Sequence, residues 1–275
     1  MRWHSQMVDF AGEAGMLHGE LILPHDGMPF PGAVLCHGMG SDHRAMKPCA
    51  QRIARQGVAT LSFDFRGHGR SEGKLDGNEA QDVVAAVEFL RQRPEIDAGR
   101  IALVGHSLGA MAVINAANKV ERLSALVSLS SPSETGGRAE GFLLSLYHKA
   151  AQVGSFIFEY PRHGPLPGMG KLEGAISVLW MRFRGYRLYV DWEKSLELWT
   201  KLRLSAAFER LGPFPKLFVH CKGDKAISYQ DVLKLYRKVV PPKEFFLAEG
   251  GFHTTPLLPG RLRRRWITWL VSMLT

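Results

Sequence analysis

The fold is decided by Ile101-Ala102-Leu103-Val104-Gly105-His106-Ser107-Leu108-Gly109, which an alanine-rich segment follows. The first four apolar residues predict a buried strand, and the alanine-rich segment predicts a helix. The serine between them has a glycine two positions away on either side. This pattern predicts a sharp strained turn that holds the hydroxyl above the edge of a sheet, because only small residues fit beside such a turn. Ser107 is therefore the candidate nucleophile.

Similar apolar runs recur along the chain, and segments with helical periodicity separate most of them. The runs lie at 33–36, 59–63, 101–104, 125–129, 217–220 and 245–248. Helical periodicity occupies 46–53, 83–90, 232–239 and 262–273. Near the start of the chain, alternating apolar residues on either side of 12–15 predict a β-hairpin. The whole pattern predicts an α/β protein with a mostly parallel, doubly wound sheet of about eight strands.

One long stretch, residues 131–212, interrupts this alternation. It is too long for a plain connection in a compact domain. It contains two helical-looking segments and many aromatic residues between Phe156 and Trp199. We predict an inserted helical lid (cap) over 131–212 and a core formed by 1–130 and 213–275. A few of the aromatic side chains are expected to form an apolar wall of the active-site cleft.

Composition limits the class of protein. With 275 residues, 45% of them hydrophobic, the chain is long enough for one large core. It has no apolar run long enough to span a bilayer, and its first residues lack the features of a signal peptide, so we expect a cytoplasmic protein. Cys36, Cys49 and Cys221 form no Cys-x-x-Cys pair and leave one cysteine over, which indicates neither disulfides nor a zinc site.

The chain is basic, with a formal net charge of +9. Most of this charge is dispersed, and two local clusters, at 182–187 and 261–265, are expected to be solvated faces of helices. We predict no nucleic-acid partner and keep association with an anionic membrane surface as a minor alternative. The glycine pairs at 67–69 and 168–170 lack the third glycine of a dinucleotide-binding loop, so no cofactor is predicted. The oligomeric state stays open.

A serine hydroxyl needs a neighbouring base, and the base needs a third group that orients it. In sheets of this kind ligands bind outside the carboxyl ends of the strands, so the partners are expected after the later strands. Asp224 follows the run 217–220, and His253 follows the run 245–248. We predict that His253 is the base and Asp224 its acid. The rival carboxylates are Asp191, Asp231 and Glu249.

The oxyanion hole is expected just after the strand at 33–36. Backbone N–H groups there would meet the charge of a tetrahedral intermediate, and we assign this role to Met39 and to Leu108, the residue after the nucleophile. Three neighbours are candidates for lining the pocket: His37, Gly38 and His106. Other polar residues are expected to shape a tight loop: Asp64, Arg66 and His68. The remaining histidines, such as His43, His148 and His163, show no metal-ligand spacing and are expected at the surface or in loops, so no metal is predicted.

With these residues the chain resembles the α/β-hydrolase superfamily over nearly its whole length outside the predicted lid. The order Ser107, Asp224, His253 is the order of serine, acid and histidine in that superfamily. Within it, the pattern is similar to bacterial carboxylesterases related to cinnamoyl or feruloyl esterases and monoacylglycerol lipases. The usual Gly-His-Ser-Met-Gly-Gly is here Gly-His-Ser-Leu-Gly-Ala, ending at Ala110. The motifs that carry the resemblance are Cys36-His37-Gly38, residues 64–71, Gly105 to Gly109, Gly223-Asp224 and Gly251-Phe252-His253.

These residues and the resemblance imply a serine hydrolase that cleaves carboxylic esters through an acyl-enzyme. The expected partner is a small-molecule ester with an apolar or aromatic acyl group. Thioester hydrolysis, acyl transfer and carbon–carbon bond hydrolysis use the same triad and stay open. Ser107 disfavours the carboxylate nucleophile of dehalogenases and epoxide hydrolases. From another class, the alternative is a non-catalytic relative that binds a ligand or a membrane surface.

Overall fold

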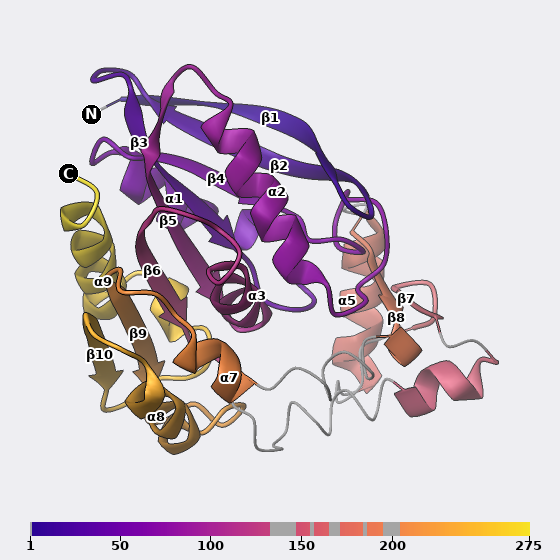
Figure 1. Ribbon diagram of the computed structural model, residues 1–275. Helices are drawn as coiled ribbons and strands as arrows, with labels where there is room; N and C mark the ends of the chain where they lie inside the picture. The colour runs from indigo at the N-terminus through magenta and orange to yellow at the C-terminus, as the bar shows by residue number, and fades with distance from the viewer. Residues whose placement is uncertain (1, 133–146, 155–156, 165–170, 184–185, 195–203) are drawn as a thin grey trace.

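An eight-stranded sheet forms the centre of the molecule (Figure 1). The structure is a computed structural model that describes residues 2–132, 147–154, 157–164, 171–183, 186–194 and 204–275. Strands β1 (Trp3–Gly12) and β2 (Gly15–Pro24) form the predicted hairpin, and β2 pairs antiparallel with β4 (Ala59–Phe63). The strand order across the sheet is β1-β2-β4-β3-β5-β6-β9-β10. From β4 to β10, every pair of neighbouring strands is parallel. The other strands are β3 (Phe30–Cys36), β5 (Ile96–His106), β6 (Leu123–Leu129), β9 (Lys216–Cys221) and β10 (Lys243–Ala248).

The apolar runs of the sequence coincide with these strands, which confirms the predicted sheet. Every residue of β3 and β4 is buried, as expected for strands that helices cover on both faces. Successive side chains of a strand point to opposite faces. In β3, Ala33 and Leu35 accordingly belong to one hydrophobic cluster, and Val34 and Cys36 belong to the other. Strand β5 is longer than predicted and begins at Ile96.

Helices cover both faces of the sheet (Figure 1). On the face of Val34 pack α2 (Glu79–Arg91), α3 (Leu108–Ala116) and the buried side of α8 (Tyr229–Lys238). On the face of Ala33 pack α1 (Lys47–Ala54) and α9 (Arg261–Ser272). These helices lie where helical periodicity, or the alanine-rich segment after Ser107, predicts them. Within the described ranges, no helix combines the length and the apolar character needed to cross a membrane.

The chain between β6 and β9 contains the stretch 131–212, where the sequence predicts an insertion. Its described parts include α5 (Lys171–Phe183) and α7 (Leu204–Glu209). They also include a two-stranded antiparallel sheet of β7 (Ile157–Tyr160) and β8 (Leu188–Asp191), which the sequence analysis did not predict. The two strands were missed because four-residue strands are too short to show an alternating pattern. Phe156 and Trp199, which bound the aromatic-rich stretch, lie outside the described residues.

Backbone hydrogen bonds join β8 to the loop after β4. The Tyr189 N–H donates to the Gly67 carbonyl at 2.6 Å, and the Leu75 N–H donates to the Tyr189 carbonyl at 2.8 Å. The neighbouring side chains Leu188, Val190 and Trp192 are fully buried. This part of the insertion therefore packs as an extension of the core, next to the loop at 64–76.

Candidate active site

Ser107 occupies the turn between β5 and α3. Its backbone has φ 54° and ψ −116°, a conformation that is costly for a residue with a side chain. The flanking glycines are required by close packing. A Cβ at Gly105 would collide with the Gly109 carbonyl, and one at Gly109 would collide with the carbonyls of Cys36 and His37. The predicted strained turn is therefore present, and it leaves the Ser107 side chain partly exposed at the end of the sheet.

Asp224 and His253 meet directly. His253 Nδ1 lies 2.8 Å from Asp224 Oδ2, and the other oxygen, Oδ1, accepts the N–H groups of Ala226 and Ile227 at 2.9 and 3.1 Å. Burial acts to raise the pKa of Asp224, but the hydrogen bond and charge of His253, together with these N–H donors, hold this pKa below its usual value. An ionised Asp224 accepts a hydrogen bond from the Nδ1–H of His253, which leaves His253 Nε2 as the free position of the ring.

The rival carboxylates interact with other groups. Glu249 forms an ion pair with Lys222 at 2.8 Å, and Asp231 forms one with Lys234 at 2.9 Å. Asp191 Oδ1 accepts the backbone N–H of Lys194. Among the three rivals and Asp224, the contact with the His253 ring belongs to Asp224.

A second histidine that the sequence analysis did not select lies beside this pair. His220 is fully buried in β9, and its Nε2 is 3.1 Å from the Ile227 carbonyl and 3.4 Å from Asp224 Oδ2. It therefore joins the end of β9 to the loop that carries Asp224. A signal was available in the sequence, because a histidine inside a buried apolar run needs a hydrogen-bond partner.

The main chain of His253 has two further contacts. Its carbonyl oxygen accepts a hydrogen bond from His106 Nε2 at 3.0 Å and one from Ser130 Oγ at 2.8 Å. His106 directly precedes Ser107, and Ser130 directly follows β6. The Ser107 N–H in turn donates to the Leu129 carbonyl at 3.0 Å. The ends of β5 and β6 and the loop after β10 are thus linked around Ser107.

The loop after β3 lies against Ser107. A Cβ at Gly38 would be 3.3 Å from Ser107 Cβ and 3.1 Å from His106 Nδ1. The N–H groups of Met39 and Leu108 make no hydrogen bond to any residue in the described ranges. Leu108 opens helix α3, where the first N–H groups have no partner within the helix. Leu108 directly follows Ser107, and Met39 directly follows Gly38, which lies against Ser107. The two N–H groups, without partners among the described residues, remain the candidates for the oxyanion hole.

Two buried histidines attach this loop to the end of β4. His37 Nδ1 donates to the Gly38 carbonyl at 2.7 Å, and His37 Nε2 accepts the Phe65 N–H at 3.1 Å. His68 Nδ1 donates to the Arg66 carbonyl at 3.1 Å, and His68 Nε2 accepts the Gly40 N–H at 3.3 Å. An accepting Nε2 requires the neutral ring. Burial lowers the pKa of both histidines, that of His68 to about 3.

The neutral His68 ring predicts that the free energy of unfolding decreases as the pH falls. The pKa of His68 is about 3 in the folded chain against 6.5 for an ordinary histidine, so the unfolded chain binds a proton first as the pH falls. The stability that neutral His68 contributes is complete above pH 6.5 and is lost as the pH falls toward 3. The loss amounts to at most about 1.4 kcal/mol for each pH unit in that window.

Urea unfolding at a series of pH values from about 7.5 to 4.5 measures this loss, within the window that linkage defines. In the variant His68→Asn the free energy of unfolding should fall less steeply with decreasing pH than in the wild type. His4→Asn, which removes an exposed imidazole, is the matched control and should retain the wild-type slope. Parallel curves for wild type and His68→Asn would contradict the assignment.

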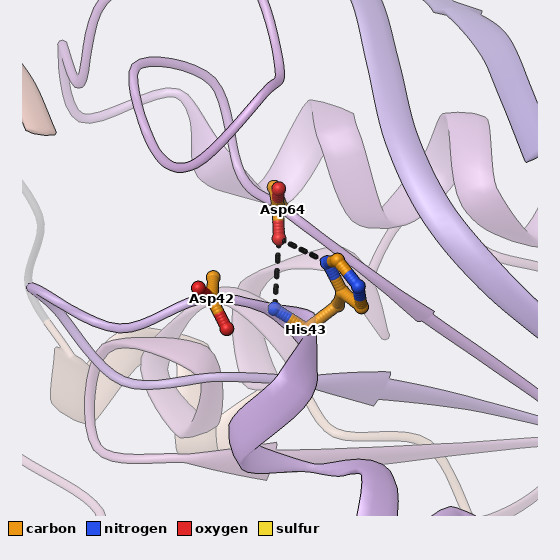
Figure 2. Close-up of side chains that lie close together, drawn as sticks. All are labelled: Asp42, His43 and Asp64. Carbon is orange, nitrogen blue, oxygen red and sulfur yellow. Dashed lines mark hydrogen bonds and ion pairs between the residues drawn. The ribbon is translucent and has the colours of Figure 1, made fainter. Parts of the chain in front are cut away.

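Asp64 anchors the neighbouring loops (Figure 2). Its Oδ1 accepts both the backbone N–H and the Nδ1–H of His43 at 2.7 Å, and its Oδ2 accepts the Arg70 N–H at 2.9 Å. Burial acts to raise the pKa of Asp64, but the interactions with His43 outweigh it and lower this pKa to about 2. The prediction that His43 is a surface or loop residue is wrong: it lies buried in a 3-10 turn (His43–Ala45) because Asp64 satisfies both of its donors.

Asp42, His43 and Asp64 lie close enough for one ligand atom of each to approach a common cation. The chain itself already uses these atoms, however. Asp42 forms an ion pair with Arg44 and caps the turn by accepting the Arg44 N–H at 3.0 Å. Since Asp64 Oδ1 holds His43, the group is explained by its own hydrogen bonds, and we assign no metal to it.

A pocket of about 250 Å³ adjoins the loop after β3. It combines residues of that loop and of the turn that follows with two residues of the insertion: Gly40, Ser41, Asp42, Arg44, Ala45, Met181 and Tyr186. The Tyr186 hydroxyl donates to the Ser41 carbonyl at 3.2 Å, so the insertion contacts the loop directly. The predicted pocket-lining residues His37, Gly38 and His106 are buried and are not part of this lining.

The sheet order and the strained serine turn define an α/β-hydrolase fold, and comparison with known proteins assigns the family. Residues 33–262 match the Alpha/beta hydrolase family, and the chain belongs to it. The uncharacterized protein Rv2307c of Mycobacterium tuberculosis (strain ATCC 25618 / H37Rv) is 34% identical over 261 residues, covering 92% of this chain and 76% of that protein. An uncharacterized 31.7 kDa protein of the traX-finO intergenic region of Escherichia coli is 32% identical over 111 residues, covering 38% of this chain and 39% of that protein.

Solved structures share the fold. A complex of DcsB with its substrate analogue has a TM-score of 0.77 and 21% identity, with 99% of this chain and 100% of that chain covered. The Pyrococcus furiosus esterase Pf2001 has a TM-score of 0.68 and 19% identity, with 99% and 90% covered. Est1E from Butyrivibrio proteoclasticus with bound ferulic acid has a TM-score of 0.67 and 17% identity, with 96% of each chain covered. These likenesses confirm the predicted fold.

Proposed function

We propose that this α/β hydrolase cleaves carboxylic esters with Ser107 as nucleophile, His253 as base and Asp224 as the acid that orients the base. The observation that carries the proposal is the 2.8 Å contact between His253 Nδ1 and Asp224 Oδ2, made next to a serine in a strained turn. A carboxylate on Nδ1 fixes the tautomer and stabilises the imidazolium that forms when Nε2 takes a proton. No other group in the described part of the chain unites a strained, partly exposed nucleophile with a histidine held by a carboxylate.

The proposed reaction has two halves. Ser107 Oγ attacks the ester carbonyl carbon while His253 Nε2 takes the hydroxyl proton, and the tetrahedral intermediate then expels the alcohol, which receives that proton. Water next attacks the acyl-serine, again losing a proton to His253, and the carboxylic acid and free Ser107 are released. The N–H groups of Met39 and Leu108 support both steps, because they can donate to the negative oxygen of each intermediate.

For the substrate we propose a small-molecule ester with an apolar or aromatic acyl group. Met181 and Tyr186 bring apolar surface from the insertion to the loop that holds Met39, which supports the role of the insertion as a lid. The esterase Pf2001 and the ferulic-acid complex of Est1E share the fold and are consistent with this class. In an apolar pocket one methylene changes the free energy of transition-state binding by only about 1 to 3 kcal/mol, so we expect a broad preference among acyl groups.

A fluorophosphonate probe and a panel of p-nitrophenyl esters test the proposal. We expect one covalent label per chain, located by peptide mass spectrometry at Ser107. Across acyl groups of increasing length and aromatic character, kcat/KM should rise, because a better-filled apolar pocket stabilises the transition state. Failure of the probe to react, together with turnover at the rate of the buffer alone, would contradict the proposal.

A further inference from the structure

His253 lies on an exposed loop, and its position therefore needs an explanation. Its neighbours Gly251, Phe252 and Thr254 are all exposed, and Asp224 holds only the ring. The backbone carbonyl of His253 has two lone pairs, and both are used: His106 Nε2 donates at 3.0 Å and Ser130 Oγ at 2.8 Å. We propose that Ser130 and His106 are positioning residues that fix the main chain of His253 relative to Ser107. This inference rests on the proposed role of His253 as the base.

Ser130 has an unusual backbone. It is fully buried and has φ 49°, and within the described ranges it shares a positive φ with only two other non-glycine residues, Ser107 and Arg122. Such a conformation costs on the order of 1–3 kcal/mol and persists where the surroundings enforce it. The Ser130 N–H donates to the Val219 carbonyl at 2.9 Å. Ser107 follows β5 and Ser130 follows β6, and because these neighbouring strands are parallel, both strained serines lie at the same end of the sheet. The turn at Ser130 aims its hydroxyl at the loop of His253.

His106 connects the same carbonyl to the nucleophile. It precedes Ser107 in the chain, its ring centroid is 5.0 Å from that of His253, and its Nδ1 faces Gly38 in the loop after β3. Burial, reinforced by the neighbouring His253, lowers the pKa of His106 to about 4. A neutral His106 donates its Nε2–H without placing a second positive charge beside the imidazolium that forms on His253 during the reaction.

Two independent sets of hydrogen bonds thus fix the position of His253, the proposed base. Asp224 sets the rotation of the ring through Nδ1, whereas Ser130 and His106 set the main chain from which the ring projects. A shift of the main chain moves His253 Nε2 away from the Ser107 hydroxyl even when the contact with Asp224 is kept. Errors of about 1 Å in such an arrangement can cost as much as about 100-fold in rate.

The test compares Ser130→Ala and Ser130→Gly with a matched control. Ser128→Ala removes another buried hydroxyl, two positions earlier in β6, which has no hydrogen-bond partner among the described residues. We expect kcat to fall about tenfold in both Ser130 variants while KM stays within about twofold of the wild type. Glycine suits a positive φ, so the melting temperature of Ser130→Gly should equal or exceed that of Ser130→Ala. A purely structural role would instead make activity follow stability.

His106 supplies a second arm. His106→Gln keeps a side-chain N–H donor and should retain more of kcat than His106→Phe, which keeps a ring but has no donor. The fluorophosphonate probe should still label the Ser130 and His106 variants, only more slowly, because Ser107 is unchanged. Equal kcat values for Ser130→Ala and Ser128→Ala with a labelled wild type would overturn this inference alone. An unlabelled, inactive wild type would overturn the proposed function and this inference with it.

Discussion

Ser107→Ala is expected to abolish fluorophosphonate labelling and to lower kcat for p-nitrophenyl esters by about 10⁴-fold or more. In the proposed mechanism the variant lacks the oxygen that forms the acyl-enzyme, so only substrate binding and the proposed oxyanion donors remain to accelerate attack by water. Labelling with the probe and steady-state turnover measure the two effects separately. Loss of the hydroxyl relieves no strain, because the backbone at this position keeps its positive φ.

Ser128→Ala serves as the control for the serine variant as well. It removes a hydroxyl from a buried position of β6 that the proposed reaction does not use, so labelling and turnover should match the wild type. Labelling that persists in Ser107→Ala, at the same peptide or at another, would identify a different nucleophile and would overturn the assignment.

His253→Ala is expected to lower kcat nearly as much as Ser107→Ala, and the double variant should be no slower than either single one. The reason is that in the proposed mechanism Ser107 is a poor nucleophile without His253 as its base, so the two residues act as a unit and their losses do not add. Steady-state kinetics of the two single variants and the double variant provide the measurement. A His253→Ala enzyme with a rate close to the wild type would show that another group removes the proton.

Asp224→Asn provides an internal comparison for this second prediction. The amide cannot stabilise the imidazolium as a carboxylate does, and it can favour the wrong tautomer of His253, so a smaller but large loss is expected. Glu249→Gln is the matched control, since Glu249 forms an ion pair with Lys222 and belongs to the same region. A loss in Glu249→Gln that exceeds the loss in Asp224→Asn would transfer the role of the acid to Glu249.

Much of the fold follows from local patterns. Strands β3 and β4 are buried on both faces, so their apolar runs are continuous and easily recognised. The carboxyl ends of parallel strands meet at one edge of the sheet, which is why the spacing of the serine, acid and histidine predicts a common site. The contact between His253 and Asp224 has the geometry that this rule anticipates.

Other features depend on contacts that no local pattern encodes. In the sequence, Ser130 has no feature that distinguishes it from another serine after a strand. Its positive φ and its hydrogen bond to the His253 carbonyl form only when β6, β9 and the loop after β10 come together in the fold. His43 looks like a loop histidine until Asp64, 21 positions along the chain, satisfies both of its donors. Tertiary hydrogen bonds of this kind decide the environment of a residue more strongly than its sequence neighbours do.

The attachment of β8 has a consequence for protein engineering. An exchange of the whole segment 131–212 for that of another hydrolase would also remove the strand that pairs with Gly67 and Leu75 and the Tyr186 hydroxyl that holds Ser41. Such a chimera would change the loops after β3 and β4 together with the insertion, and a loss of activity in it would say little about selectivity. Graft junctions that keep 186–192 with the recipient would preserve these contacts, so that an exchange of the remaining segment would test the proposed role of the insertion in substrate selection.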